Sequence, residues 1–178
     1  EKVPTNLCKF IETAAQIFHG KAVSKDVVFD YSACNDPKNI NTIVMIDHSK
    51  LARVIRNFIS NALKFTRAGD SIQINVNTFH KEKKVKEESS IFGSEFKFSS
   101  VVPEDHIDIE SQNDPPPHHN FVRIEVKDTG IGIAEENIEK IFNQSIQIDS
   151  YRNQQRGGGS GLGLLIAKKI VEEHKGEL

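Results

Sequence analysis

Long apolar runs, paired cysteines and a strong charge bias are all absent from this sequence. No apolar run approaches the roughly 18–20 residues that a bilayer-spanning helix needs, and no charged-then-apolar signal segment opens the chain. The two cysteines, Cys8 and Cys34, follow neither a metal-binding spacing nor a disulfide-dense pattern, so we expect reduced thiols. A net charge of −2 and a pI near 6.4 argue against a general nucleic-acid-binding protein.

Glycine is present in ordinary number but is unevenly placed. Of the 11 glycines, seven lie in two short windows, at residues 130–132 and 157–163. The length of 178 residues is near that of one domain, and the chain begins mid-pattern without a methionine, which indicates a soluble piece of a longer protein. Composition alone indicates no function, so the two glycine windows are the places to search.

Apolar periodicity predicts a set of helices and strands. Spacings of three and four predict helices at residues 5–19, 48–66, 134–142 and 162–173, with Gly20 as C-cap of the first and Asp47 as N-cap of the second. β-Branched and alternating patterns predict strands at residues 27–31, 42–46, 71–78 and 122–128. This order predicts an α/β (α+β) two-layer sandwich, in which helices cover one face of a mixed, mostly antiparallel sheet.

The stretch from about residue 80 to residue 120 breaks this pattern. It holds charged runs such as Lys81-Glu82-Lys83-Lys84 and ends near three consecutive prolines. About forty residues of little periodicity are unusual inside a compact domain. We therefore expect a single domain over residues 1–178 that carries an insertion, ordered only in part, at about residues 80–120. Apolar residues in it, such as Phe96 and Phe98, could dock on the domain or on a partner.

Two asparagines and a lysine share one side of the second predicted helix. Asn57, Asn61 and Lys64 stand at positions i, i+4 and i+7. Asparagine oxygens are hard neutral ligands that suit Mg²⁺, and a lysine one turn further adds a positive charge for phosphate. The alternative is that these residues form an ordinary solvated helix face.

The two glycine windows offer backbone close to a ligand. Asp128-Thr129-Gly130-Ile131-Gly132 predicts a strand that enters a tight turn, where Asp128 can accept a hydrogen bond from an exocyclic amine such as that of adenine. The alternative is a plain strand–turn–helix connection. The run from Gly157 to Leu164 opens onto the last helix, whose free N–H groups and dipole favour an anion. A flexible linker fits this run poorly, because Leu162 and Leu164 are already in helical register.

In this order and at this spacing, three motifs resemble the N box and the two glycine boxes of sensor histidine kinases. The motifs are Asn57–Asn61 with Lys64-Phe65-Thr66, then Asp128–Ile133, then Gly159–Leu164. The resemblance covers the chain from about residue 4 to residue 178. It implies the ATP-binding catalytic domain of the GHKL superfamily, with a Bergerat fold whose C-terminal hairpin is truncated, most similar to eukaryotic-type hybrid kinases.

The resemblance also implies a role for each matching residue. Asn61 would bind Mg²⁺ together with the phosphates, Asn57 would support it or bind it too, and Lys64 would reach the phosphates as the third implied catalytic residue. Asp128 would bind adenine, and the second glycine box would surround the phosphates. The implied set of ATP-binding residues is Asn57, Asn61, Lys64, Phe65, Asp128, Gly130, Gly132, Ile133, Gln147, Gly159, Ser160, Gly161, Leu162, Gly163 and Leu164.

The sequence departs from the family pattern at the implied lid, residues 142–156, and after the last helix. Phe142-Asn143-Gln144-Ser145 stands where Phe-Glu-Pro-Phe is usual, which removes the second aromatic residue. Lys175 stands where a glycine is usual. The first departure bears on packing of the lid and on docking of a partner helix.

Asn57 also bears on the reaction. ATP-hydrolysing members of the superfamily carry a glutamate at this position to activate water, and an amide cannot act as a general base near pH 7. The resemblance therefore implies a protein histidine kinase, whose domain positions ATP for a histidine elsewhere. None of the seven histidines has the helix–His–acid setting of a phosphoacceptor, so we expect the acceptor before Glu1 and any receiver domain after Leu178.

Two other functions stay open at this point: a degenerate nucleotide-binding regulatory module without kinase activity, and a hydrolysing GHKL ATPase. The expected partners are Mg–ATP, the histidine-bearing dimerisation domain of the same protein and a downstream receiver domain, with no nucleic acid. We expect the fragment to be monomeric, because dimerisation in the family belongs to the upstream hairpin. The expected location is cytoplasmic, either free or as the cytosolic part of a membrane-bound receptor kinase.

Overall fold

The computed structural model describes residues 1–32, 42–79, 94–99, 121–134, 137, 141 and 162–178, and the structural statements below concern those residues. Four strands form one sheet in the order β2 (Val28–Asp30), β4 (Ser71–Phe79), β6 (Phe121–Asp128), β5 (Ser94–Ser99). β2 is parallel to β4, whereas the β4–β6 and β6–β5 pairs are antiparallel. β1 (Val3–Asn6) and β3 (Ile43–Ile46) form a separate antiparallel pair. The prediction of a mixed, mostly antiparallel sheet is confirmed.

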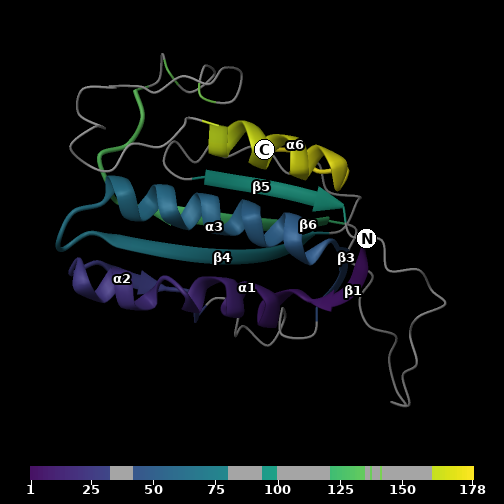
Figure 1. Cartoon of the computed structure of the whole chain (residues 1–178), viewed down its shortest axis with the longest axis horizontal. Helices are drawn as coiled ribbons and strands as arrows, with labels where there is room; N and C mark the ends of the chain where they lie inside the picture. Colours follow the sequence, from purple (N-terminus) through teal and green to yellow (C-terminus); the bar gives the residue numbers. More distant parts are fainter. Residues whose placement is uncertain (33–41, 80–93, 100–120, 135–136, 138–140, 142–161) are drawn as a thin grey trace.

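Three helices lie side by side across one face of the sheet (Figure 1). The central one, α3 (His48–Phe65), contacts both α1 (Leu7–Gln16) and α6 (Leu162–Glu173), while the short α2 (His19–Ser24) contacts β2. Alternate residues of the two long strands are buried beneath these helices because successive side chains of a strand point to opposite faces. They are Ile72, Ile74 and Val76 of β4 and Val122, Ile124 and Val126 of β6. Within the described segments, no helix is long and apolar enough to cross a bilayer.

The boundaries of α3 and α6 follow from their sequences. The carboxylate of Asp47 accepts the Lys50 N–H at 3.1 Å and so caps the start of α3, as predicted. α6 has the predicted bounds, and Lys175, two residues after its end, adopts a left-handed φ of 60°. Glycine adopts that conformation most easily, which explains why a glycine is usual there in the family that the sequence resembles.

The first predicted helix, at residues 5–19, is wrong at both ends. Thr5 and Asn6 belong to β1, where they pair with Val44 and Ile43. Asn6 then caps α1, since its side-chain oxygen accepts the Lys9 N–H at 3.0 Å. The helix ends at Gln16, and Gly20 lies inside α2 instead of capping α1. Strand pairing with a distant segment overrides the helical pattern at Thr5.

Strand β5 was not predicted, because residues 94–99 fall in the stretch interpreted as an insertion. Its sequence alternates Phe96 and Phe98 with Glu95 and Lys97, which is a period-two signal. Phe96 pairs with Ile124 of β6. The rest of residues 80–120 lies outside the described residues, as does most of the helix predicted at residues 134–142.

Substituting alanine for Gly20 and for Gly69 is expected to change the free energy of unfolding in opposite directions. A Cβ at either site would meet no atom within 4 Å. Gly20 lies in a helix, where alanine is favoured over glycine by about 0.5–1 kcal/mol, so Gly20→Ala should raise the free energy of unfolding. Gly69 has a φ of 86°, so Gly69→Ala should lower it by about 1–2 kcal/mol. Urea denaturation of both variants checks this, and a shift of equal sign would contradict it.

Candidate functional site

The predicted polar side of α3 is present in the structure. Asn57, Asn61 and Lys64 are each half-buried on a flank of the helix. The apolar side faces the core with seven buried residues, which are Leu51, Val54, Ile55, Phe58, Ile59, Ala62 and Leu63. Because the apolar side holds the helix on the sheet, the two asparagines and the lysine lie outside the side of α3 that packs on the core.

The start of α6 packs directly on Asn57. A Cβ built on Gly163 would lie 2.2 Å from Asn57 Oδ1 and 3.1 Å from its Nδ2, so only glycine allows this approach. At the other end of the contact, Lys50 Nζ lies 2.7 Å from Glu173 Oε2, so the two helices run in opposite directions. The first and third sequence motifs therefore meet where α6 begins, although Asn57 and Gly163 are 106 positions apart.

Asn57 has a polar atom that the described part of the protein leaves unused. Its Nδ2 is buried and has no hydrogen-bond partner among the described residues. A buried donor without an acceptor is unfavourable. It fits an anionic oxygen brought by a ligand better than it fits a cation, because an amide N–H cannot coordinate a metal. In this orientation Asn57 suits a phosphate.

The second motif lies at the C-terminal end of α3, against Phe65. A Cβ on Gly130 would lie 2.6 Å from the Phe65 carbonyl oxygen, and that oxygen accepts the Ile131 N–H at 3.3 Å. The Gly130 N–H donates to Asp128 Oδ1 at 3.0 Å. Gly132 has a φ of 69°, which side-chain-bearing residues rarely adopt. The turn after β6 is thus fastened to the end of the helix that carries Asn57.

Asp128 has the electrostatics of a buried acceptor. Burial raises the pKa of its carboxyl above the ordinary 3.8; the Gly130 N–H partly offsets this, and the Asp70 carboxylate adds repulsion. Desolvation disfavours its charge, so a donor from a ligand would be bound strongly. This is the property that a side chain recognising an exocyclic amine requires.

Lys64 and Phe65 occupy the same end of α3. The Lys64 Nζ lies 5.2 Å from the centre of the Phe65 ring, within the range of a cation–π contact. Two further predicted ATP-binding residues are exposed, Ile133 at 50% and Leu162 at 42%. Leu164, one turn into α6, packs partly on the core. Gln147, Gly159, Ser160 and Gly161 lie outside the described residues.

Hydrogen bonds of Thr129 at this site could not be predicted from the sequence. The Thr129 hydroxyl accepts the Ser71 N–H at 2.9 Å and donates to Asp70 Oδ1 at 3.4 Å, although Thr129 and Asp70 are 59 positions apart. Only the antiparallel register, which pairs Ile72 with Asp128, brings them together. Thr129 therefore joins the turn after β6 to the turn before β4.

The structure combines a mixed sheet covered by helices with two glycine-containing segments, the turn after β6 and the start of α6, which both contact α3. This combination defines an ATP-binding domain of the GHKL class. The family model described as "Histidine kinase-, DNA gyrase B-, and HSP90-like ATPase" matches residues 46–178, and the chain belongs to that family.

Known proteins agree with this family. The chain is 27% identical over 175 residues to histidine kinase P4 of Formosa agariphila, covering 97% of this chain and 10% of that protein. It is 26% identical over 178 residues to hybrid signal transduction histidine kinase K of Dictyostelium discoideum, covering 100% of this chain and 12% of that protein. It thus spans about a tenth of the length of these curated relatives.

The fold is shared with a solved structure. The catalytic domain of the histidine kinase ThkA superposes with a TM-score of 0.63 at 22% identity, over 98% of this chain and 82% of that one. The family and its relatives support a kinase-type, ATP-binding role.

Proposed function

We propose that this domain binds Mg–ATP and donates the γ-phosphoryl group to a histidine on a separate, upstream dimerisation helix. The observation that carries the proposal is the contact of Asn57 with Gly163, which leaves an unpartnered amide donor at the first turn of α6. The N-terminus of a helix favours phosphate through its free N–H groups and its dipole. Because the chain belongs to the ATPase family, we infer that this anion is the phosphate chain of ATP.

Each end of the site then has a distinct task. Asp128 accepts a hydrogen bond from the adenine amine, in the turn that Gly130 and Phe65 hold against α3. Asn57 Nδ2 and the Lys64 ammonium attract the phosphates, and α6 adds its dipole. The histidine nitrogen would attack the γ-phosphorus while the bond to the bridging oxygen breaks, so that ADP leaves with that electron pair and the imidazole loses its N–H proton.

One side chain of the site, Asn61, offers a ligand that suits a magnesium ion. Asn61 stands one turn after Asn57 on the same flank of α3, and a carboxamide oxygen is a hard neutral ligand. We propose that Asn61 would hold Mg²⁺ through this oxygen, with the phosphates supplying further ligands. Asn57 would join it only with its amide turned, so that Oδ1 replaces Nδ2. Bound there, the metal supplies neutralisation of phosphate charge.

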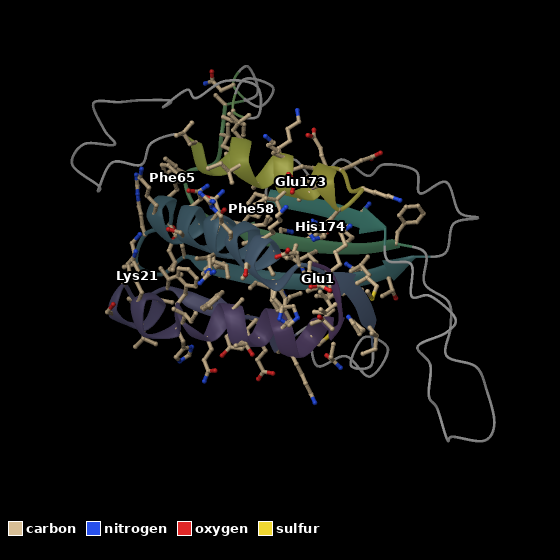
Figure 2. All side chains as sticks on the ribbon, turned by 45° about the vertical axis from the view of Figure 1, so that its right-hand side comes forward. Glu1, Lys21, Phe58, Phe65, Glu173 and His174 are labelled. Atoms are coloured by element: carbon tan, nitrogen blue, oxygen red, sulfur yellow. The ribbon has the colours of Figure 1, made fainter. Side chains whose placement is uncertain are left out.

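Two of the three histidines in the described segments, His48 and His174, make contacts within the fold, whereas His19 is exposed at the start of α2. His174 is 4% exposed; its Nε2 accepts the Asp47 N–H at 3.2 Å, so Nδ1 carries the proton and donates to the Ile170 carbonyl at 2.8 Å. Figure 2 shows His174 beside Glu173 at the end of α6. His48 Nε2 lies 2.6 Å from the Thr5 hydroxyl. The rings of His48 and His174 are thus engaged within the fold, and His19 is followed by Gly20 instead of an acidic residue. We therefore propose an acceptor histidine in the dimerisation domain, with that domain and a receiver domain as partners.

Three further properties belong to the proposal. We expect slow intrinsic hydrolysis of ATP, because Asn57 offers no general base to a water molecule. We also propose that the isolated domain is monomeric and cytoplasmic, where ATP is available to it.

An ATP titration by calorimetry tests the proposal. We expect binding of ATP with MgCl₂ and weaker binding with EDTA, because the phosphates would then lack a counter-charge. Adding the upstream histidine helix in trans should yield acid-labile phosphate on that helix. Binding without phosphate transfer would indicate a regulatory module, rapid phosphate release without the helix would indicate a hydrolysing ATPase, and absence of binding would remove the proposal.

A further inference from the structure

The last turn of α3 needs partners for its carbonyl groups. A helix leaves its final carbonyls unpaired, and a glycine after the helix commonly satisfies them through a left-handed turn. Here the helix ends at Phe65, and Thr66 is extended, with φ of −82° and ψ of 160°. The usual glycine arrangement is therefore absent at Thr66. Its N–H donates to the Ala62 carbonyl at 3.0 Å, and its hydroxyl reaches the Leu63 carbonyl only at 3.5 Å, so the remaining bonds come from elsewhere in the fold.

A lysine far away in the sequence supplies two of these partners. Lys25 Nζ donates to the Leu63 carbonyl and, at 2.7 Å, to the Thr66 carbonyl. The two acceptors flank Lys64 and Phe65, so one ammonium group bridges the segment that holds both. A positive charge is also favourable at a helix C-terminus.

The loop that carries Lys25 is itself fixed to the turn after α3. Lys25 follows α2 as its C-cap, and Asp26 adopts a left-handed φ of 56°, which is uncommon for a residue other than glycine. The Asp26 carbonyl accepts the Gly69 N–H at 2.8 Å, and the Val28 N–H donates to the Asp70 carbonyl at 2.9 Å. These two bonds hold the loop against the turn after α3, next to the carbonyls that Lys25 contacts.

The bridged segment reaches both halves of the nucleotide site. Its Phe65 carbonyl accepts the Ile131 N–H and lies against Gly130, in the turn that presents Asp128. Its Lys64 side chain is the cation proposed for the phosphates. We propose that Lys25 is a positioning residue of this site, which sets Lys64 and the turn at residues 128–132 through the backbone of residues 63–66. The inference rests on the proposed function only for the identity of the ligand.

The test compares three variants of the full 178-residue chain. Lys25→Met keeps the unbranched chain up to the ε position and removes the ammonium, and Lys25→Arg keeps the charge and offers N–H donors. Lys21→Met is the matched control, because Lys21 is an exposed lysine of the neighbouring α2, at the same end of the molecule as Phe65 (Figure 2). The two readouts are ATP affinity with MgCl₂ by calorimetry and hydrogen exchange of the Ile131 amide by NMR.

We expect Lys25→Met to weaken ATP binding roughly tenfold, the effect of losing one charge-assisted hydrogen bond, and to speed exchange of the Ile131 amide. Lys25→Arg should stay within about threefold of wild type, and Lys21→Met should change neither readout. A loss confined to thermal stability, with ATP affinity and Ile131 exchange as in Lys21→Met, would overturn the inference. If Lys25→Met does not fold, Lys25→Gln takes its place under the same criteria.

Failure of the proposed function can be told apart from failure of this inference. A wild-type chain that binds no ATP contradicts the proposed function, and the exchange of the Ile131 amide then decides the role of Lys25 alone. Faster exchange in Lys25→Met than in Lys21→Met supports the bridge through Phe65. Equal exchange overturns it.

Discussion

Gly163→Ala is expected to weaken ATP binding by roughly 100-fold or more, equivalent to about 2.7 kcal/mol. The added Cβ would lie 2.2 Å from Asn57 Oδ1 and 2.9 Å from its Cγ, so the carboxamide must leave its place. Asn57 carries the donor proposed for phosphate, and Gly163 lies in the first turn of α6, so one methyl group disturbs both parts of the anion site. Calorimetric titration with ATP and MgCl₂ measures the loss.

Gly20→Ala is the control for this substitution, since it adds the same methyl group to another helix where no atom lies within 4 Å. It should leave ATP affinity unchanged. A double-mutant cycle isolates the clash: Gly163→Ala should cost about 1–3 kcal/mol of stability by overpacking, and little once Asn57→Ala has removed the carboxamide. Normal ATP binding by Gly163→Ala would show that Asn57 and Gly163 do not belong to the site.

The sequence predicted those parts of the fold whose signals are local. The helices at 48–65 and 162–173 were recognisable because each carries its apolar stripe within the segment itself, and Asp47 directly before the first of them caps it. Thr5 was assigned to the wrong element because its partner, Val44, stands in a strand that no window around Thr5 contains. β5 was missed for a similar reason, since its pairing with β6 outweighs the charged stretches around it.

The candidate site divides in the same way. Glycines, asparagines and Asp128 could be found by residue type and spacing, because the chemistry of phosphate and adenine restricts which side chains serve. The contacts of these residues could not be predicted from the sequence. Gly163 packs on Asn57 and Gly130 packs on Phe65 because of how α6 and β6 are placed around α3. Lys25 had no motif, because it acts on backbone carbonyls and any cation at the right place in the fold would do the same.

Asp128→Asn should separate affinity from stability. Replacing the carboxylate removes the charged acceptor for the adenine amine and presents an amide whose N–H₂ can face it, so we expect ATP affinity to fall roughly 100-fold. Stability at neutral pH should be equal or higher, because burial and the Asp70 carboxylate both disfavour the charge that is removed. The Gly130 N–H keeps its acceptor, since asparagine retains an Oδ1.

The pH dependence follows from the sign of this shift. The pKa of Asp128 is raised, so the folded state holds its proton more tightly than the unfolded chain, and this group lowers stability as pH rises from 3.8 through the raised pKa. ATP binding needs the ionised form and should decline as pH falls through that same raised pKa. In Asp128→Asn both dependences should be missing, which calorimetry and urea denaturation across the acidic range can measure.

Asp30→Asn is the matched control, because its carboxyl has the opposite shift. The Ser32 N–H, 2.8 Å from Asp30 Oδ1, lowers the pKa of Asp30. The ionised carboxyl therefore stabilises the fold at pH values above its pKa in the unfolded chain, and this stabilisation is lost as the pH falls through its pKa in the folded state. Asp30→Asn should lower stability slightly and leave ATP affinity intact, since β2 lies at the sheet edge away from β6. Equal losses of affinity in the two variants would mean that Asp128 acts only through the fold.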